Sequence, residues 1–308
     1  MRLSETAAKR LAADSSVVAV EQDRKVALAE GTQSGAEWGL DRLDQSALPL
    51  NRSYTYPNTA ANVTAYILDT GVRLTHSEIA GRASSGYDFV DKDSDASDCQ
   101  GHGTHVAGTV AGKTYGVAKA AKIVSVRVLG CDGSGSYSGI IAGVEWVTKN
   151  AAKPAVVNMS LGGTTSAALD AAVRKSIAAG VTYAVAAGNE NKNACAVSPA
   201  RTAEAITVGA TDSRDTRASF SNYGSCVDLF APGVGILSST KNGDTTTGKM
   251  SGTSMATPHV AGAAALYLST HPTATPAQVR DALVTGATAN KVSDPKGSPN
   301  KLLYVGGF

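Results

Sequence analysis

Short apolar runs alternate with alanine-rich helical patterns along most of this chain, and no other feature of the sequence restricts the fold as strongly. The candidate strands are Thr64–Leu68, Ile123–Leu129, Ala155–Met159, Val181–Val185 and Ala205–Val208. The candidate helices are His102–Ala111, Tyr137–Asn150, Ala167–Ala179, Ser254–His271 and Thr275–Thr285. The runs are continuously apolar, as expected of strands covered on both faces. The alternation therefore predicts an α/β fold built from βαβ units around a mostly parallel sheet.

Composition and charge exclude several classes of protein. A content of 43% hydrophobic residues is too high for a disordered chain. The 28 basic and 26 acidic residues leave a net charge of +2, so neither nucleic acid nor an anionic membrane is an expected partner. The longest apolar stretch, Val260–Leu268, is too short to cross a bilayer, which takes about 20 residues. The opening Met1–Lys9 lacks the continuous apolar region of a signal peptide.

The pattern changes near residue 30. Residues 1–30 predict a helix at Ser4–Ala13, a strand at Val17–Glu21 and a charged tail, and a Gly-Thr-Gln-Ser-Gly stretch follows. We therefore divide the chain into a segment of residues 1–30 and a domain of residues 31–308. The alternative is that residues 1–30 are the first helix and strand of that domain.

The cysteines are Cys99, Cys131, Cys195 and Cys226. Four cysteines allow three pairings. No Cys-x-x-Cys motif is present, which argues against a zinc ribbon or a thioredoxin-like site. The even number favours two disulfides and an oxidising compartment, with buried free thiols as the alternative.

Three segments place a reactive side chain where open α/β sheets build their sites. Asp69 ends an apolar strand, His102 begins a helix inside a glycine-rich segment, and Ser254 begins another helix. Each has an ordinary alternative reading. Asp69 could be a turn residue, His102 could pair with His105 on a metal, and Ser254 could be a helix N-cap.

The combination points to nucleophilic catalysis. A serine hydroxyl is a poor nucleophile at neutral pH and needs an adjacent base, which a histidine oriented by a carboxylate supplies. Asp69, His102 and Ser254 stand in one of the chain orders known for such triads. Asn189 follows the strand candidate Val181–Val185, where its amide could donate to a developing oxyanion.

These segments resemble those of the subtilisin-like serine proteases over residues 31–308. The cysteine spacings and the segment from Trp38 to Gln45 resemble the proteinase K branch, and within it the aqualysin-like secreted bacterial enzymes. The resemblance implies a three-layer α/β/α fold with a mostly parallel central sheet. It also implies a secreted, monomeric serine endopeptidase of broad specificity that prefers apolar or aromatic side chains before the scissile bond.

The resemblance assigns roles residue by residue. Asp69 becomes the orienting carboxylate, His102 the general base and acid, and Ser254 the nucleophile. Asn189 becomes the oxyanion donor, together with the backbone N–H of Ser254. His105 and His259 lie in the same motifs and are expected to pack or hydrogen-bond structurally.

The resemblance also implies a cleft that binds polypeptide substrates as an added strand. The expected substrate-binding residues are Gly133, Ser134, Gly135, Ser160, Leu161, Gly162, Ala187 and Gly188. The last two would wall an apolar pocket, with Glu190 at its rim. Ordinary turns are the alternative reading of the glycine-rich stretches.

Disulfides, calcium and a propeptide follow from the same resemblance. The implied pairs are Cys99–Cys131 and Cys195–Cys226. Structural Ca²⁺ is the implied cofactor. Its expected ligands are Asp88, Asp93 and Asp95 in a first site, Asp41, Asp44, Gln45, Asn51 and Ser53 in a second, and Asp228 with the carbonyls of Ala203 and Ala205 in a third. Residues 1–30 are similar to the C-terminal part of the family's inhibitory propeptide, which would act as an inhibitory partner in the cleft after cleavage near Glu30.

Two further hypotheses compete with an active endopeptidase. A catalytically silent binding module would need no intact catalytic set. A metal-dependent hydrolase would use His102 and His105 as ligands, but no His-Glu-x-x-His motif accompanies them.

Overall fold

The computed structural model describes residues 4–14, 16, 17 and 31–307. The helices are α1 (Glu5–Ala12), α2 (Trp38–Asp41), α3 (His102–Ala111), α4 (Tyr137–Asn150), α5 (Ala167–Ala178), α6 (Thr253–Thr270) and α7 (Pro276–Gly286), with a single 3₁₀ turn, η1, at Ala194–Ala196. The strands are β1 (Gly31–Ser34), β2 (Ser53–Tyr56), β3 (Thr64–Asp69), β4 (Ala83–Asp88), β5 (Lys122–Arg127), β6 (Ala155–Met159), β7 (Thr182–Ala186), β8 (Ile206–Thr211), β9 (Leu229–Pro232), β10 (Ile236–Ser239), β11 (Thr247–Met250), β12 (Thr288–Ala289) and β13 (Lys301–Leu302).

The main sheet has nine strands in the order β12-β13-β9-β8-β7-β6-β3-β5-β4. Every neighbouring pair in it is parallel except β12 with β13. The hairpins β1–β2 and β10–β11 form two smaller antiparallel sheets. The mostly parallel sheet expected from the sequence is therefore confirmed.

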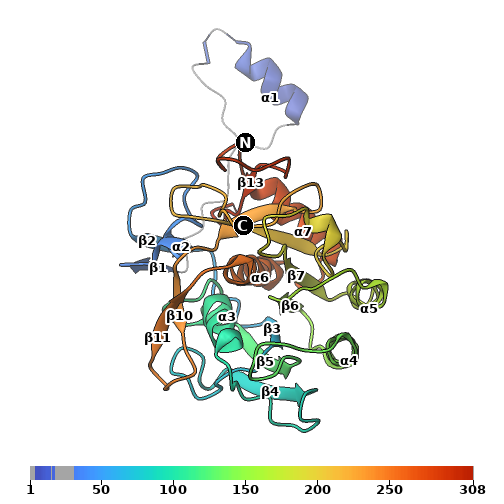
Figure 1. The fold of residues 1–308 in the computed structure, drawn as a ribbon. Coiled ribbons are helices and arrows are strands. Elements are labelled where there is room, and N and C mark those ends of the chain that lie inside the picture. Colours follow the sequence, from blue (N-terminus) through green and yellow to red (C-terminus); the bar gives the residue numbers. More distant parts are fainter. Residues whose placement is uncertain (1–3, 15, 18–30, 308) are drawn as a thin grey trace.

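Helices cover both faces of this sheet (Figure 1). Alternate residues of β3 enter different cores, because successive side chains of a strand point to opposite faces. Ala65 and Ile67 pack in the core that contains α3, α6 and α7, whereas Tyr66 and Leu68 pack in the core that contains α4 and α5. The result is the three-layer α/β/α arrangement, with α6 almost fully buried at its centre.

The predicted helices and strands of the domain are all present, with ends that differ by at most a few residues. The two helices α3 and α4 have the predicted bounds, and Thr275 caps α7 in a full capping box with Pro276 at the first helical position. Strand β5 ends at Arg127 rather than Leu129, because the backbone N–H groups of Val128 and Leu129 both donate to the carbonyl oxygen of Asp69.

The segment before residue 31 is described only in part. The helix expected there is present as α1, with Ser4 as its N-cap. The strand expected at Val17–Glu21 lies, beyond Val17, outside the described residues. In Figure 1 the helix α1 stands apart from the body of the domain.

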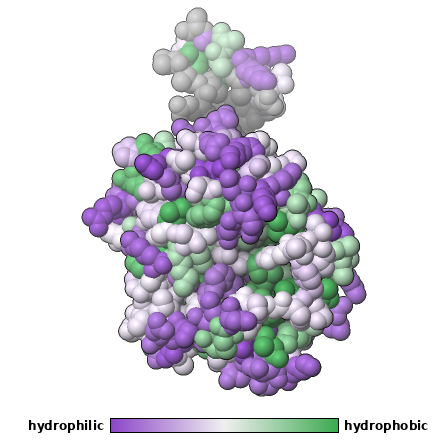
Figure 2. All heavy atoms as spheres, in the orientation of Figure 1, coloured by the Kyte–Doolittle hydropathy of each residue, from purple (hydrophilic) through white to green (hydrophobic). Residues whose placement is uncertain are grey.

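The described helices include none that is long and apolar enough to cross a membrane. On the face shown in Figure 2, the coloured apolar residues form small separate patches among polar ones. Such scattered patches are ordinary on a globular surface.

Candidate active site

The site forms where the carboxyl ends of three neighbouring strands meet. Strands β3, β6 and β7 lie side by side in the sheet. Asp69 is the last residue of β3, Ser160 directly follows β6, and Asn189 follows β7 by three residues. Carboxyl ends of parallel strands open on one edge of the sheet, so the topology brings these side chains together.

His102 reaches this edge from the first position of α3. Its Nδ1 lies 2.7 Å from Oδ1 of Asp69, whose side chain has no exposed surface. The backbone N–H of Thr70 donates to the same oxygen at 2.8 Å. A side chain at Gly103 could not be accommodated, since its Cβ would lie 2.1 Å from the carbonyl oxygen of Gly71. Glycine at this position therefore allows α3 to approach β3 closely enough for the bond.

The carboxylates around His102 change its affinity for a proton. Burial disfavours the charged imidazolium and lowers the pKa of His102. The charge of Asp69, the hydrogen bond to it and the charge of Asp98 act in the opposite direction and outweigh burial. The net result is a pKa of His102 raised above its ordinary value, which suits a base that must take up a proton.

Ser254 occupies the second position of α6. Its Oγ donates to the carbonyl oxygen of Ser160 at 3.1 Å, and Oγ of Ser160 donates to the carbonyl oxygen of Ser254 at 2.8 Å. Among the described residues, Ser254 makes no hydrogen bond to His102. Such bonds are often loose in a free enzyme and form when substrate binds, and a rotation about the Cα–Cβ bond of Ser254 redirects its hydroxyl.

Asn189 is oriented by the start of α6. Its Oδ1 accepts from the backbone N–H of Thr253 at 2.8 Å and from Oγ1 of Thr253 at 2.9 Å. The side-chain oxygen is thereby occupied, and Nδ2 remains as a donor beside Ser254. The positive end of the helix dipole at the same place also favours a developing negative charge.

Two cavities meet at these residues. The first has a volume of about 430 Å³ and the second about 560 Å³, and both are bordered by Ser254, Asn189 and Leu161. His102 borders only the second cavity, with Gly133, Ser134, Gly135, Ser160 and Gly162. The residues expected to flank a substrate thus lie along one groove. Alpha-helix α1 contributes no described residue to either cavity.

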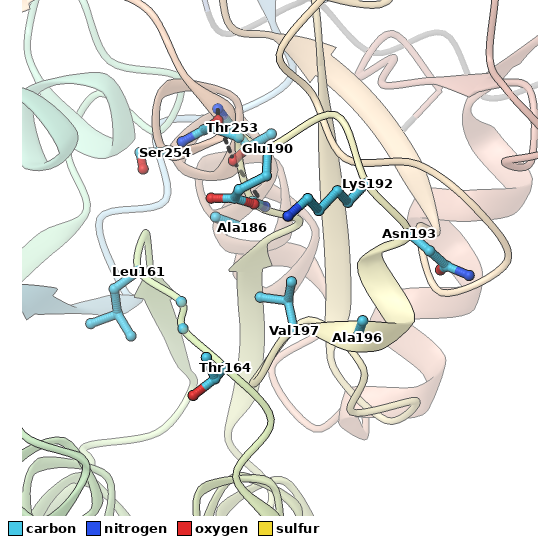
Figure 3. A pocket seen from close by; sticks show the side chains of 14 residues that line it. Leu161, Thr164, Ala186, Glu190, Lys192, Asn193, Ala196, Val197, Thr253 and Ser254 are labelled. Carbon is cyan, nitrogen blue, oxygen red and sulfur yellow. Dashed lines mark hydrogen bonds between the residues drawn. The ribbon is translucent and has the colours of Figure 1, made fainter.

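The first cavity has small residues in its wall and charged residues at one end. Ala186, Gly188 and Val197 border it. In Figure 3 the side chains of Glu190 and Lys192 point toward one another across the pocket. Oε2 of Glu190 accepts from Nδ2 of Asn222 at 2.9 Å, which fixes the carboxylate.

One residue of the expected pocket wall lies elsewhere. Ala187 is fully buried and packs in a core beneath the cavity rather than bordering it. The carbonyl oxygen of Ala187 accepts from Nδ2 of Asn222. Ala187 lies just beyond the end of β7, and its neighbours Ala186 and Gly188 border the cavity.

The other two histidines of the motifs are buried. Nε2 of His105 lies 2.9 Å from the carbonyl oxygen of Ile236, and Nδ1 of His259 lies 2.9 Å from that of Met255. Burial lowers the pKa of each to about 4. Both are therefore neutral at pH 7, and His105 is held away from His102 as a metal partner. Within the described part of the chain, no three His, Cys, Asp or Glu side chains are grouped to hold a metal ion.

The cysteines form the two pairs that the family resemblance implied. Cys99 is bonded to Cys131 and Cys195 to Cys226. The first disulfide joins the loop before α3 to the loop that carries Gly133. The second lies next to Asn193 and Ala196, which border the first cavity.

The three expected calcium sites differ in how their carboxylates are bonded. Oδ2 of Asp88 accepts from Arg127 at 2.6 Å, and Oδ1 of Asp228 accepts from Arg280. A guanidinium thus already neutralises each of these carboxylates, so these two sets do not fit a cation as they stand. Asp93 and Asp95 are exposed and accept from backbone N–H groups of their own loop.

The second set fits a cation better. Asp41 is buried and accepts from the backbone of Arg52, and Gln45 donates to Asp41 and to Asn51. Oδ1 of Asp44 is buried without a hydrogen-bond partner among the described residues. Burial raises the pKa of Asp44. An unpartnered carboxylate oxygen among other oxygens is the donor type that Ca²⁺ takes.

Several residues that build the site are absent from the sequence-based set. Thr253 orients Asn189, Thr70 donates its backbone N–H to Asp69, and Asn158 donates to Oγ of Ser160 at 2.9 Å. A threonine beside a motif residue is a weak sequence signal for a site role, since threonine commonly forms helix caps and turns. Only the three-dimensional structure shows whether such a threonine orients a site residue or forms a cap or turn.

Comparisons with known proteins agree with this geometry. The model of the subtilase family matches residues 60–303. An extracellular serine proteinase of Thermus sp. (strain Rt41A) is 58% identical over 96% of this chain and 72% of its own length. An alkaline serine exoprotease A of Vibrio alginolyticus is 55% identical over 98% of this chain and 57% of its own length. The crystal structure of a cold-adapted subtilisin-like serine proteinase superposes with a TM-score of 0.87 at 57% identity, over 88% of this chain and 99% of that one.

Proposed function

Because the chain belongs to the subtilase family of serine-type endopeptidases, we propose that Asp69, His102, Ser254 and Asn189 hydrolyse peptide bonds through an acyl-enzyme. The observation that carries the proposal is the 2.7 Å bond between the buried Asp69 and His102, at a cavity that Ser254 and Asn189 also border.

The proposed reaction begins at Ser254. Its Oγ attacks the carbonyl carbon of the scissile bond and passes its proton to Nε2 of His102, while Asp69 stabilises the imidazolium. The oxyanion of the tetrahedral intermediate accepts hydrogen bonds from Nδ2 of Asn189 and the backbone N–H of Ser254. His102 then protonates the leaving amine. A water molecule, deprotonated by His102, cleaves the resulting ester and restores the hydroxyl.

We propose that the substrate is an extended polypeptide. The segments at Gly133–Gly135 and Ser160–Gly162 border the same groove on two sides, as strand addition of an extended chain requires. The small residues Ala186 and Gly188 support an apolar or aromatic side chain before the scissile bond in the 430 Å³ cavity. Glu190 and Lys192 border the same cavity, so its charged end carries one acidic and one basic group.

A comparison of the unchanged chain with Ser254→Ala tests this function. We expect only the unchanged chain to hydrolyse a chromogenic peptide with an aromatic residue before the scissile bond. A serine-directed inhibitor should attach one equivalent to it and none to the variant, as read by intact mass. Equal hydrolysis by both proteins would overturn the serine mechanism.

We further propose that residues 1–30 are the end of an inhibitory propeptide and that the enzyme is secreted. A relative named as extracellular and the two disulfides support secretion. Intact mass after incubation tests the propeptide, since self-cleavage near Glu30 removes that segment from the unchanged chain and leaves Ser254→Ala whole.

We also propose a structural Ca²⁺ held by Asp41, Asp44, Gln45, Asn51 and Ser53, whose carboxylate and amide oxygens suit this ion. Bound there, it would neutralise Asp41 and Asp44 and fasten the segment between α2 and β2. The fit is supported by the buried, unpartnered Oδ1 of Asp44.

A further inference from the structure

The loop that enters α3 is organised by one carboxylate outside the catalytic set. Asp98 precedes His102 by four residues and is partly exposed. Its Oδ1 accepts from the backbone N–H groups of Gln100 at 2.9 Å and Gly101 at 2.7 Å. Its Oδ2 accepts from the backbone N–H of Thr104 at 2.9 Å and from the hydroxyl of Thr104.

The hydrogen bonds to Asp98 perform the function of an N-cap for helix α3. The N-cap residue of α3 is Gly101, which has no side chain to satisfy the first N–H groups of the helix. Asp98 accepts from two of those groups, and Gln100 accepts from the backbone N–H of His102 through Oε1 at 2.8 Å. The turn that carries the imidazole is therefore held from outside the helix.

The same carboxylate also reaches the strand that carries Asp69. Oγ1 of Thr70 donates to Oδ1 of Asp98 at 3.0 Å and accepts from the backbone N–H of Gly103 at 3.0 Å. Thr70 directly follows Asp69. Asp98 thus joins the backbone on either side of His102 to the residue next to Asp69, across two elements that are far apart in sequence.

The neighbouring residue extends the connection to the substrate groove. Cys99 is bonded to Cys131, two residues from Gly133. Gln100 borders the same cavity as His102 and Gly133. The loop from Asp98 to Gln100 therefore touches the helix, the catalytic strand and the groove wall within three residues.

We infer that Asp98 is a positioning residue for the proposed reaction, which holds the His102 imidazole against Asp69 and supplies a second negative charge when His102 is protonated. The inference rests on the proposed function. Among the described residues, other charged or titratable groups near His102 include Asp69 on β3, His105 on α3 and Lys241, whose aliphatic chain lies over Gly101.

The test compares Asp98→Asn and Asp98→Ala with the unchanged full chain. Active sites are counted with a serine-directed inhibitor, so that unfolded protein does not enter kcat. We expect kcat to fall about tenfold in Asp98→Asn and about a hundredfold in Asp98→Ala, because small displacements of catalytic groups cost that much. The KM should stay within about twofold, since Asp98 does not border the groove.

The pH dependence separates this role from a merely structural one. Loss of a negative charge near His102 should move the acid limb of kcat/KM about 0.5 pH unit lower, because the imidazolium loses a stabilising partner. Asp212→Asn is the matched control. Asp212 also accepts from backbone N–H groups, those of Arg214 and Thr216, but lies beyond β8. We expect its kcat and acid limb to be unchanged.

A measurement without hydrolysis keeps the inference distinct from the proposed function. In the Ser254→Ala chain, NMR titration of the His102 ring should show the same downward shift on Asp98→Asn. If the unchanged chain hydrolyses nothing, the proposed function fails and this titration still decides on Asp98. An unchanged His102 titration, or an unchanged kcat and acid limb, overturns the inference.

A second pair of variants covers the case in which the Asp98 variants do not fold. Thr70→Val and Thr104→Val each remove one hydroxyl donor to Asp98 and leave its charge in place. We expect kcat to fall several-fold in each with the acid limb unmoved. A kcat equal to that of the unchanged chain in both variants overturns the inference.

Discussion

At the scale of single residues, the proposed oxyanion donor, Asn189, depends on its neighbour Thr253. An asparagine side chain can present either its oxygen or its nitrogen to a cleft, and only the nitrogen can donate to an oxyanion. Both donors of Thr253 point at Oδ1 of Asn189 and so select the productive orientation. The hydroxyl supplies one of these two hydrogen bonds.

Thr253→Val removes the hydroxyl and keeps the shape of the side chain. We expect kcat to fall about tenfold, the equivalent of one lost neutral hydrogen bond of about 1.4 kcal/mol. Asn189→Ala should cost about 10²–10³ in kcat, a figure taken over from the corresponding change in a subtilisin rather than worked out for this chain.

A double-mutant cycle with steady-state kinetics checks the dependence. If Thr253 acts through Asn189, its replacement has little further effect in the Asn189→Ala background. Multiplicative losses would instead mean that Thr253 supports the start of α6 independently. Thr257→Val is a suitable control, because its hydroxyl donates only to the carbonyl oxygen of Thr253.

The residues that sequence analysis found and those it missed differ in kind. Asp69, His102 and Ser254 stand out because their proposed roles need chemistry that few residue types can perform. Neither Asp98 nor Thr253 is in the set of site residues predicted from the sequence. Their roles consist of hydrogen bonds to backbone groups, and such bonds restrict the sequence only weakly. The geometry that reveals them exists only in the folded chain.

At the scale of elements, two disulfides of nearly equal span support different parts of the site. Their sequence separations are 32 and 31 residues. Chain entropy therefore predicts a similar stabilisation for each, about 3–4 kcal/mol. Only Cys99–Cys131 adjoins the loop of Asp98, whereas Cys195–Cys226 adjoins the cavity that Asn193 borders.

Replacing each pair by serines should separate stability from function. We expect similar losses of unfolding free energy from denaturant titration in the Ser254→Ala background, which cannot digest itself. In the active chain, Cys99→Ser with Cys131→Ser should lower kcat. Cys195→Ser with Cys226→Ser should mainly raise the KM for large side chains before the scissile bond. Equal kinetic effects of both replacements would contradict the assignment of each disulfide to its own part of the site.

Helices α3 and α6 each carry one buried neutral histidine. His105 and His259 have a pKa of about 4 because burial opposes their charged forms. The unfolded chain binds these protons near pH 6.5. Since the unfolded state binds more protons between pH 6.5 and 4, acidification through that window lowers stability, by about 3 kcal/mol per histidine.

The thermal midpoint of the Ser254→Ala chain should therefore fall as pH decreases from 6.5 to 4. His259→Gln removes one of the two groups and should flatten that decrease, even if it lowers the midpoint at pH 7. His271→Gln is the control, because His271 is exposed and its replacement removes no buried imidazole. An unchanged slope in His259→Gln would show that acid destabilisation comes from other groups.

The elements that the sequence predicted best are those with the clearest apolar pattern. Strands β3 and β6 and helices α3 and α4 have continuous or periodic apolar residues, and their bounds agree to within a residue. Strand β4 and the hairpin β10–β11 were not predicted. Ala83–Asp88 contains two serines and a glycine, and strands at the edge of a sheet need little apolar surface. The pairing of these strands depends on partner strands elsewhere in the sequence, which a local residue pattern does not reveal.

At the scale of the whole molecule, the first segment of the domain contains two acidic residues, Asp41 and Asp44, that have no basic side chain as a partner among the described residues. Arg42, also in this segment, forms a buried ion pair with Asp215 beyond β8, so residues 31–56 are tied to the far end of the sheet. Asp41 and Asp44 have no such basic partner among the described residues. Two neighbouring carboxylates partly removed from water repel one another unless a cation is bound.

Removal of calcium should therefore loosen this segment and destabilise the whole domain. We expect a chelator to lower the thermal midpoint of the Ser254→Ala chain. Asp44→Asn removes a calcium ligand and also the repulsion between the carboxylates of Asp41 and Asp44. We therefore expect this variant to lower the midpoint less in chelator, where no calcium is bound, than in calcium. Asp244→Asn is the matched control, since Asp244 is paired with Arg73 and lies outside the proposed set. A chelator effect of equal size in Asp44→Asn and in the unchanged background would place the stabilising ion elsewhere, with Asp88 or Asp228 next to be changed. Those carboxylates would then have to release Arg127 or Arg280 to bind it.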